Sequence, residues 1–358
     1  MKLPPVIERP DMSLQIPLPK LITDVLRHNQ YQVKRYLESM DKRRVYRSKF
    51  KVRIRVFICM DGRLNFDIMT ETPLGVMQSE RNIGARNDLS YDALNVRMRE
   101  FVQSAIDAGE EVLLIITYHD DCRGWDYCAK AAEQNAMTFA TSLREAFYGC
   151  PVSVVVMGIM THRQQLVLHH GVTLERVVTT GELPRDRQKI CELARMIYPD
   201  CPTSVQENLA ELIVGNVRHI GKIKGEHKKL THNERVLCIG NGFDWLHRRN
   251  YELILKRDAP ESECREATRG AWGLLFDNLD NNRISKEDRL LLYGSEVYDN
   301  SDWKMRLAIP RARRSTALGL SVLEEHFPQR RHQVHVMTGV TNWYNREVTL
   351  VDDCVFAV

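Results

Sequence analysis

Two short segments of the chain hold side chains that could bind a metal ion. The segment CMDGR contains Cys59, Asp61 and Arg63, and the segment HDDC contains His119 and Cys122. Thiolate and imidazole groups suit a borderline-soft ion such as Zn²⁺. A catalytic zinc ion usually takes three protein ligands and leaves a fourth position open for water. Cys59, His119 and Cys122 therefore predict a catalytic zinc site, and Asp61 and Arg63 can form an ion pair beside it.

Both segments follow apolar runs that have the character of buried strands. VRIRVFICM, residues 52–60, alternates and then becomes apolar, and EEVLLIITYH, residues 110–119, contains a continuous apolar run. Such runs are typical of strands in a parallel sheet that is covered on both faces. Helical patterns alternate with these strands, which predicts an α/β domain over residues 49–172. Its zinc ligands would lie at the carboxyl edge of the sheet, where open α/β sheets bind ligands.

The composition fits a globular protein and excludes several other classes. The chain has 358 residues, of which 43% are hydrophobic and 27% charged, so disordered and collagen-like classes fit poorly. The formal net charge of +4 gives no argument for nucleic-acid binding. No run of about 18 apolar residues occurs, so no membrane span is expected. Nine cysteines are too few for a disulfide scaffold and indicate reduced thiols in a cytoplasmic protein.

The rest of the chain is expected to form an N-terminal segment and a second α/β unit. Residues 1–48 combine a proline-rich arm with a helix over about 20–40. The basic residues within 42–55 are expected to form a solvated edge that leads into the first strand, with a docking surface for an acidic partner as the alternative. Residues 173–358 begin with helical patterns to about residue 230 and continue with strand candidates that include ERVLCIGNGF and WKMRLAIP.

The second unit repeats features of the first in the same order. RVFI, residues 55–58, is matched by RVLC, residues 235–238, and VVVMGIMT is matched by VHVMTGVT near the end of the chain. These matches predict a diverged duplication. They place Ile239, Asn241 and Phe243 opposite Cys59, Asp61 and Arg63, and they place a loop with Arg311 and Arg314 opposite the other two ligands. None of these side chains would bind zinc, so residues 173–358 are expected to form a metal-free repeat.

The motifs of the first unit resemble those of the β-class carbonic anhydrases. CMDGR fits the C-x-D-x-R motif of that family, and HDDC fits its H-x-x-C motif. Between them, ERNIG, residues 80–84, resembles the family's arginine–asparagine–x–glycine segment, and VVVMGIMTHRQQLVL resembles its last strand. The resemblance covers residues 49–172. It implies an α/β fold with a mostly parallel sheet flanked by helices, duplicated in this chain and preceded by a short helical N-terminal segment.

The resemblance also implies a role for each site residue. Cys59, His119 and Cys122 would bind zinc. Asp61 would orient the zinc-bound hydroxide or, in a closed state, occupy the fourth position itself, and Arg63 would hold Asp61 away from the metal. The reaction would be the reversible hydration of carbon dioxide to bicarbonate and a proton, because zinc lowers the pKa of bound water to about 7.

The organisation of the whole chain is similar to that of the carboxysomal shell carbonic anhydrases, in which a zinc-free relative follows the catalytic domain. That similarity implies a homo-oligomer in the cytoplasm or inside a carboxysome. It implies carbon dioxide and bicarbonate as ligands and the carboxysome shell or RuBisCO as partners, with no nucleic acid and no membrane span.

Alternative interpretations of the site stay open on the sequence alone. Relatives of this family hydrolyse carbon disulfide or carbonyl sulfide, and the ligands do not distinguish these substrates. Cys128 could replace Cys122, or it could be a fourth ligand in a scaffold protein, because a structural zinc site usually has four protein ligands. His162, His169 and His170 could be surface histidines, satisfied histidines or proton relays.

Two other segments allow a functional and a purely structural interpretation. The cluster of Arg311, Arg313 and Arg314 could bind an anionic effector or partner, or it could be a solvated helix start. IGNGFDWLH resembles a short motif of AbiH-type phage-defence proteins. The segment lacks the third glycine of a dinucleotide fingerprint, so a tight turn after a strand is the favoured interpretation.

Overall fold

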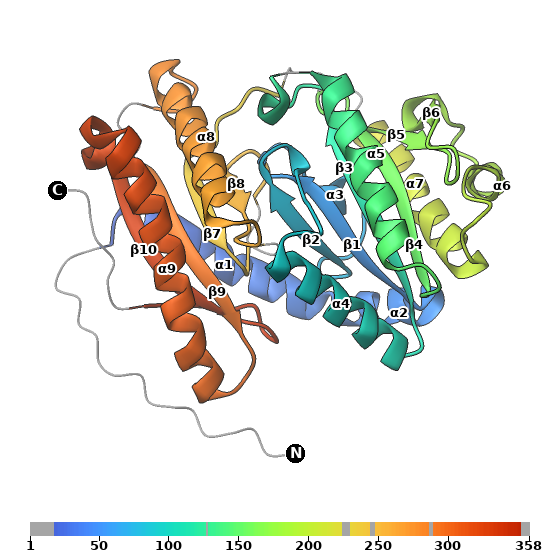
Figure 1. Cartoon of the computed structure of the whole chain (residues 1–358), viewed down its shortest axis with the longest axis horizontal. Helices are drawn as coiled ribbons and strands as arrows, with labels where there is room; N and C mark the ends of the chain where they lie inside the picture. Colours follow the sequence, from blue (N-terminus) through green and yellow to red (C-terminus); the bar gives the residue numbers. More distant parts are fainter. Residues whose placement is uncertain (1–17, 127, 224–229, 244–247, 286–288, 352–358) are drawn as a thin grey trace.

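The computed structural model describes residues 18–126, 128–223, 230–243, 248–285 and 289–351. The expected proline-rich arm lies almost entirely outside these residues. The described chain is an α/β protein with two mixed, mostly parallel sheets flanked by helices (Figure 1). Within it, every helix is too short or too polar to cross a membrane.

The first sheet contains the strands that carry the predicted metal ligands. Its order is β2-β1-β3-β4-β5-β6, in which β1 to β4 run parallel while β5 and β6 each pair antiparallel with the preceding strand. The strands are β1 (Val52–Cys59), β2 (Met77–Asn82), β3 (Glu111–His119), β4 (Val152–Met160), β5 (Gln165–His169) and β6 (Arg176–Thr179). The predicted strands over 52–60 and 110–119 are confirmed, and nearly every residue of both is buried.

Helices cover both faces of the first sheet. Two long helices bury apolar residues against Phe57 and Ile116 on one face, and two later helices with a short N-terminal one cover the other. The elements are α2 (Met40–Phe50), α3 (Phe66–Met69), η1 (Ile83–Ala85), α4 (Asp92–Asp107), η2 (Arg123–Trp125), α5 (Ala129–Ala146), η3 (Thr180–Glu182), α6 (Arg187–Ile197) and α7 (Thr203–Ile223). β6, α6 and α7 therefore lie with the first sheet, although they follow the boundary at residue 172 drawn from the sequence.

The second sheet has the same topology as most of the first. Its order is β11-β10-β9-β7-β8, with β8, β7, β9 and β10 parallel and β11 antiparallel to β10. The elements are β7 (Val236–Gly240), β8 (Glu252–Leu255), α8 (Glu261–Asp280), β9 (Leu290–Tyr298), α9 (Asp302–His326), η4 (Pro328–Gln333), β10 (Val334–Asn342) and β11 (Val348–Leu350). In order and direction, β7 to β11 thus correspond to β1 to β5, which is what a diverged duplication predicts.

One prediction of secondary structure is wrong. WKMRLAIP is part of α9 and not a strand, because Ala308, Ala312 and Ser315 recur at helical spacing and are buried on one side. The three arginines at 311, 313 and 314 are exposed on this helix and do not form a loop opposite the zinc ligands. The basic segment near 42–50 is mostly exposed, as expected, and leads into β1 as the helix α2, whose Tyr46 and Phe50 lie one turn apart and pack into the core.

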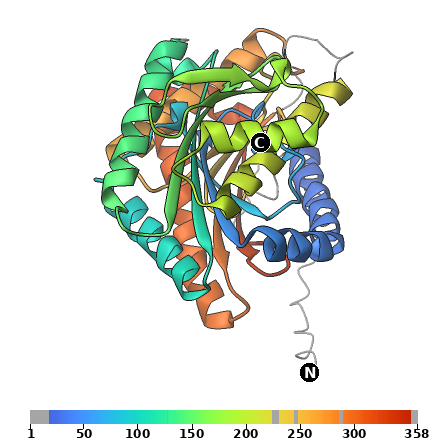
Figure 2. The ribbon, with the colours of Figure 1, turned by 90° about the vertical axis from the view of Figure 1, so that its right-hand side faces the viewer.

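The N-terminal helices connect the two halves of the molecule. α1 (Lys20–Glu38) buries Ile22 and Val25 against the second sheet, whereas Tyr46 of α2 bonds to Asn208 on α7 beside the first. Figure 2 shows both helices on one side of the molecule. The halves also meet directly, because the backbone N–H of Ile254 in β8 donates to the Met60 carbonyl. Residues of both sheets share one hydrophobic cluster.

Candidate metal centre

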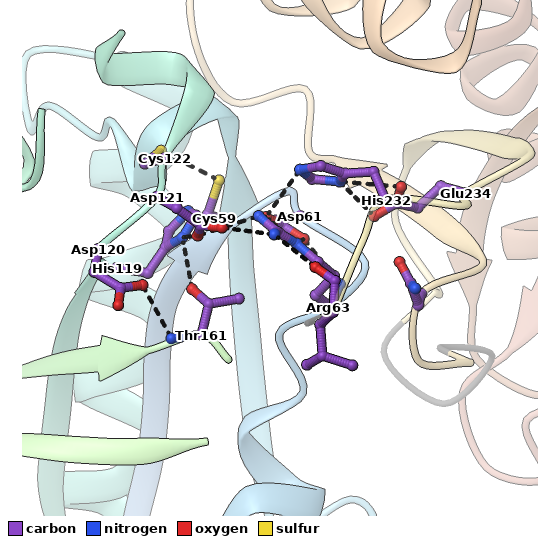
Figure 3. Close-up of polar contacts among 12 residues, drawn as sticks. Cys59, Asp61, Arg63, His119, Asp120, Asp121, Cys122, Thr161, His232 and Glu234 are labelled. Carbon is purple, nitrogen blue, oxygen red and sulfur yellow. Dashed lines mark hydrogen bonds and ion pairs between the residues drawn. The ribbon is translucent and has the colours of Figure 1, made fainter. Parts of the chain in front are cut away.

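The ends of two neighbouring strands bring the predicted ligands together. Cys59 is the last residue of β1, His119 is the last residue of β3, and Cys122 lies in the loop that follows. The Sγ atoms of the two cysteines are 3.9 Å apart, and one ligand atom from each of the three residues lies within 4.8 Å of the other two (Figure 3). All three side chains are buried. The described residues therefore contain a buried group that could hold a metal ion.

The imidazole of His119 is oriented so that one ring nitrogen is available as a ligand. Its Nδ1 is 3.1 Å from Oδ1 of Asp121 and 3.2 Å from Oγ1 of Thr161. Its Nε2 is buried and has no hydrogen-bond partner. An unsatisfied buried nitrogen is costly unless a further group binds it. A carboxylate on the other nitrogen is the usual support of a metal-binding histidine. The ring thus fits a metal ligand.

The two thiols are poised to carry a negative charge. The hydrogen bond from the Cys122 thiol lowers the pKa of Cys59 well below its ordinary value, although burial opposes this shift. The same contact, together with burial, raises the pKa of Cys122. One thiolate in the pair is therefore favoured before any cation binds, and thiolate is the form that binds metals.

Arg63 connects the carboxylates on either side of the metal-binding group. Its Nη2 donates to Oδ2 of Asp61 at 2.6 Å, and its Nη1 donates to Oδ2 of Asp121 at 2.7 Å. Arg63 is 2% exposed, so water screens these ion pairs little. Although burial raises the pKa of Asp61, Arg63 holds it below its usual range. The predicted pairing of Asp61 with Arg63 is present, and Asp121 is a further partner that joins Arg63 to His119.

The second half contributes side chains that the sequence did not point to. His232 lies just before β7, and its Nε2 is 3.9 Å from Oδ2 of Asp61 (Figure 3). Its Nδ1 is 3.1 Å from the carboxylate of Glu234, which is fully buried. Asp61, His232 and Glu234 form a second group with metal-ligand side chains. No motif surrounds His232, and only the contact between the two halves places it beside Asp61.

Close packing fixes the loop that carries Asp61 and Arg63. A Cβ atom on Gly62 would lie 2.5 Å from the carbonyl oxygen of Glu252 and 2.8 Å from Cγ of Glu234, so only glycine fits without displacement. The guanidinium of Arg81 donates to the Cys59 carbonyl at 3.0 Å and to the Leu64 carbonyl at 2.8 Å. The loop is therefore held from the second half on one side and from β2 on the other.

The ERNIG segment supports the loop that carries Cys122. The Asn82 side chain accepts from the backbone N–H of Ile83 and donates to the Arg86 carbonyl, which closes the turn at η1. Gly84 has a φ of 60°, and a Cβ there would lie 2.5 Å from Nε1 of Trp125 in η2. This turn packs against the segment that follows Cys122 and positions it.

The other sequence candidates lie at different places. Cys128 is exposed just before α5 and is not part of the group formed by Cys59, His119 and Cys122. His162 has its Nε2 3.5 Å from Asp121, whereas His169 is buried with its ring bonded to Tyr118 and to the Leu174 carbonyl. His170 accepts hydrogen bonds from its own turn. Of the three histidines, only His162 therefore lies beside the candidate centre.

The corresponding positions of the second sheet hold no such group. Ile239, the position matched to Cys59, is buried in the core, and Phe243 stacks edge-on against Tyr293. Within the ranges that the structure describes, no set of histidine, cysteine and carboxylate groups gathers at the carboxyl ends of β7 and β9. The GNG segment forms a tight turn, with φ values of 114° at Gly240 and 94° at Gly242, and residues 244–247 of IGNGFDWLH lie outside the described chain.

Comparisons with known proteins give no independent assignment. No protein-family model matches the chain, and no curated protein matches it. The resemblance to the β-class carbonic anhydrases is therefore carried by the motif residues alone. What the structure shows at this site is a buried group of Cys59, His119 and Cys122 that could hold a metal ion.

Proposed function

We propose that Cys59, His119 and Cys122 bind Zn²⁺ and that the protein catalyses the reversible hydration of carbon dioxide. The observation that carries the proposal is the convergence of two buried thiols and an unpartnered imidazole nitrogen beside an aspartate–arginine pair. Three soft or borderline ligands suit zinc, and a three-residue set leaves a coordination position open, as catalytic zinc sites do.

The surrounding residues have roles that fit this chemistry. Zinc bound at this position would act as a Lewis acid and supply a water-derived nucleophile near neutral pH. Asp121 fixes the ring of His119 through Nδ1. Arg63 keeps Asp61 ionised, so that this carboxylate can accept a hydrogen bond and orient a water molecule, and it restrains Asp61 from moving freely.

A cavity beside the ligand loops supports access by a small neutral substrate. It has a volume of about 450 Å³ and is lined by Met60 and Arg123, which directly follow Cys59 and Cys122 in sequence. Gly270 and Gly273 of α8 also line it, and their lack of side chains keeps that wall open. An uncharged gas needs no ion pair for recognition, and Met60, Ile83 and Leu274 give the cavity an apolar wall.

The direct test is zinc content together with stopped-flow carbon dioxide hydration. We expect about one zinc ion per chain, as a three-ligand site implies. Cys122→Ser should lose both zinc and activity, whereas the matched variant Cys128→Ser should keep both, because Cys128 is exposed outside the group. Full activity in a zinc-free preparation, or loss of zinc in Cys128→Ser, would contradict the proposal.

The choice of substrate is tested by the same preparation. Rates on carbon dioxide, carbonyl sulfide and carbon disulfide should be measured side by side, and we expect carbon dioxide to be the best substrate. A zinc-loaded protein that acts only on one of the sulfur compounds would keep the metal site and overturn the proposed reaction. The homo-oligomer, the carboxysome location and the shell or RuBisCO partners stay predictions.

A further inference from the structure

The second sheet has a cavity at the carboxyl ends of its parallel strands. Asn241 and Gly242 follow β7, Lys256 follows β8 and Trp343 follows β10, and all four line a cavity of about 210 Å³. β7 lies between β8 and β9, so the chain reverses its direction of travel across the sheet at this point. Open α/β sheets place their ligand sites at such reversals. In the duplicated topology, this is the place that corresponds to the metal centre.

The cavity carries a small excess of positive charge. Five cationic side chains line it: Arg47, Arg55, Arg97, Lys256 and Arg346. Three carboxylates line it as well: Asp67, Glu80 and Glu296. Asp258, which lies outside the lining, accepts a hydrogen bond from Arg97 and offsets one more cation. Among the described residues these groups sum to one positive charge, which suits a ligand with one anionic group.

Glu80 cannot neutralise the cations that surround it. Its carboxylate is 3.0 Å from Nη1 of Arg55, 2.8 Å from Nη2 of Arg97 and 3.8 Å from Nζ of Lys256. Burial opposes ionisation, but these cations lower the pKa of Glu80 to about 2. Asp258 also accepts from Arg97, so among the described residues two carboxylates, Glu80 and Asp258, face three cations.

Part of the remaining lining is apolar and includes an aromatic ring, while Gln78 and Asn241 add polar groups. Leu74, Met77 and Val297 line the cavity together with Trp343. The guanidinium of Arg346 lies 4.0 Å from the ring centre of Trp343 and holds the indole in place. A site for a bare inorganic ion would not need these apolar groups, because they add no hydrogen bonds.

We propose that this cavity binds a small organic anion, with one carboxylate or phosphate group beside Lys256 and Arg97 and an apolar body against Val297 and Trp343. The proposal does not depend on zinc or on carbon dioxide hydration. It assigns a binding site to the carboxyl edge of the second sheet, where residues of the first half complete the lining. In the first sheet, the candidate metal ligands lie at the corresponding edge.

Isothermal titration calorimetry of the full chain tests the proposal with four probes. Benzoate and phenyl phosphate combine an anionic group with an apolar ring and should both bind saturably, and their relative affinities distinguish a carboxylate ligand from a phosphate ligand. Benzyl alcohol lacks the charge and inorganic phosphate lacks the ring, so each should bind at least about tenfold more weakly. Absence of saturable binding by both aromatic anions, or equal binding of benzyl alcohol or of inorganic phosphate, overturns the proposal.

Three variants locate the binding to this cavity. Lys256→Gln removes one cation and Val297→Phe fills the space, and each should weaken binding of benzoate and phenyl phosphate at least about tenfold. Arg330→Gln, which removes a cation bonded to Asp280 away from the cavity, should leave binding unchanged. Circular dichroism verifies that each variant is folded. If Val297→Phe does not fold, the affinity of Lys256→Gln alone tests the location of the site. Unchanged affinity in Lys256→Gln places the anion elsewhere and refutes the assignment.

Discussion

The candidate metal centre and the proposed organic-anion cavity lie at corresponding ends of two sheets that share five strands of one topology. One gathers thiols and an imidazole, whereas the other gathers guanidinium and ammonium groups. Each also takes side chains from the opposite half: His232 and Glu234 approach Asp61, and Arg55 and Glu80 line the cavity of the second sheet. The comparison shows that the topology of the sheet determines where a site lies. A few side chains near the ends of the strands determine what the site can bind.

A single pair of residues illustrates the difference. Asp61 is a buried carboxylate held by Arg63, and its counterpart Asn241 is a neutral amide that accepts from Arg97 at 3.4 Å. An acid at position 241 would add a negative charge among the cations of the cavity. The amide leaves the positive excess in place, which keeps the two sites electrostatically distinct.

The largest expected effect comes from removing a ligand thiol. Cys59→Ser should abolish zinc binding and lower the carbon dioxide hydration rate by at least about a thousandfold. Cys238→Ser changes a buried cysteine in the corresponding strand β7 and should keep zinc. Elemental analysis and stopped-flow rates measure both. Equal loss of zinc in the two variants would contradict the inference that Cys59 in β1 is a zinc ligand and Cys238 in β7 is not.

A reciprocal exchange of Asp61 and Asn241 should separate the two sites. Asp61→Asn should retain zinc but lower the hydration rate by about a hundredfold, because the amide cannot replace the carboxylate that orients water. Asn241→Asp should retain zinc and weaken benzoate binding by about tenfold, because it offsets the positive charge near Arg97. Elemental analysis, stopped-flow rates and calorimetry give the three values. Unchanged benzoate binding in Asn241→Asp would count against the charge argument.

Two glycines should differ in how well they tolerate a methyl group. Gly62→Ala should lower the free energy of unfolding by about 1–3 kcal/mol, because its Cβ would collide with Glu252 and Glu234 of the second half. Gly273→Ala on α8 has no atom within 4 Å of the new Cβ and should be neutral or stabilising. Urea denaturation measures both. Similar free energies of unfolding for the two variants would show that the second half does not pack closely against the loop that carries Asp61 and Arg63.

The smallest expected effect is a change in how stability depends on pH. Burial raises the pKa of Glu252 to about 8, although the nearby Arg248 opposes the shift. The unfolded chain releases this proton near the ordinary pKa of glutamate, 4.5, whereas the folded protein holds it up to about pH 8. The free energy of unfolding should therefore fall as the pH rises between these two values.

Glu252→Gln removes this titration from the comparison. The stability of the variant relative to the native protein should increase by about 1 kcal/mol or more between acidic and alkaline pH. Thermal unfolding at several pH values tests it, with the exposed Glu324→Gln as the control. The same pH profile in the native protein and Glu252→Gln would show that this buried carboxyl does not titrate as inferred.

The sequence predicted those features that depend on local pattern. The apolar runs before Cys59 and His119 identified β1 and β3, and their parallel pairing then placed the two ends side by side. The same reasoning failed for α9, because the alternation in WKMRLAIP and the presence of Pro310 favour a strand or a break. The helix forms nonetheless, because small residues on one side pack closely against β9 and β10.

The parts of the two sites that the sequence did not predict depend on contacts between distant segments. His232 lies near Asp61 only because the two halves pack together, and no local pattern marks it. Asp121 was visible beside His119, but its bond to Arg63 requires the fold of both loops. The cavity of the second sheet likewise combines Arg55 of β1 with Lys256 after β8, which the order of residues does not reveal.

The placement of α1 has a consequence for synthesis of the chain. α1 leaves the ribosome well before β7 and β9, the strands against which Ile22 and Val25 pack. Its apolar side chains must therefore stay without their final partners while the first sheet is being made. Exposed apolar surface of this kind favours aggregation of nascent chains. The yield of native protein should accordingly depend on chaperones or on slow translation. This dependence should be stronger than for a protein in which each half folds without contacts to the other.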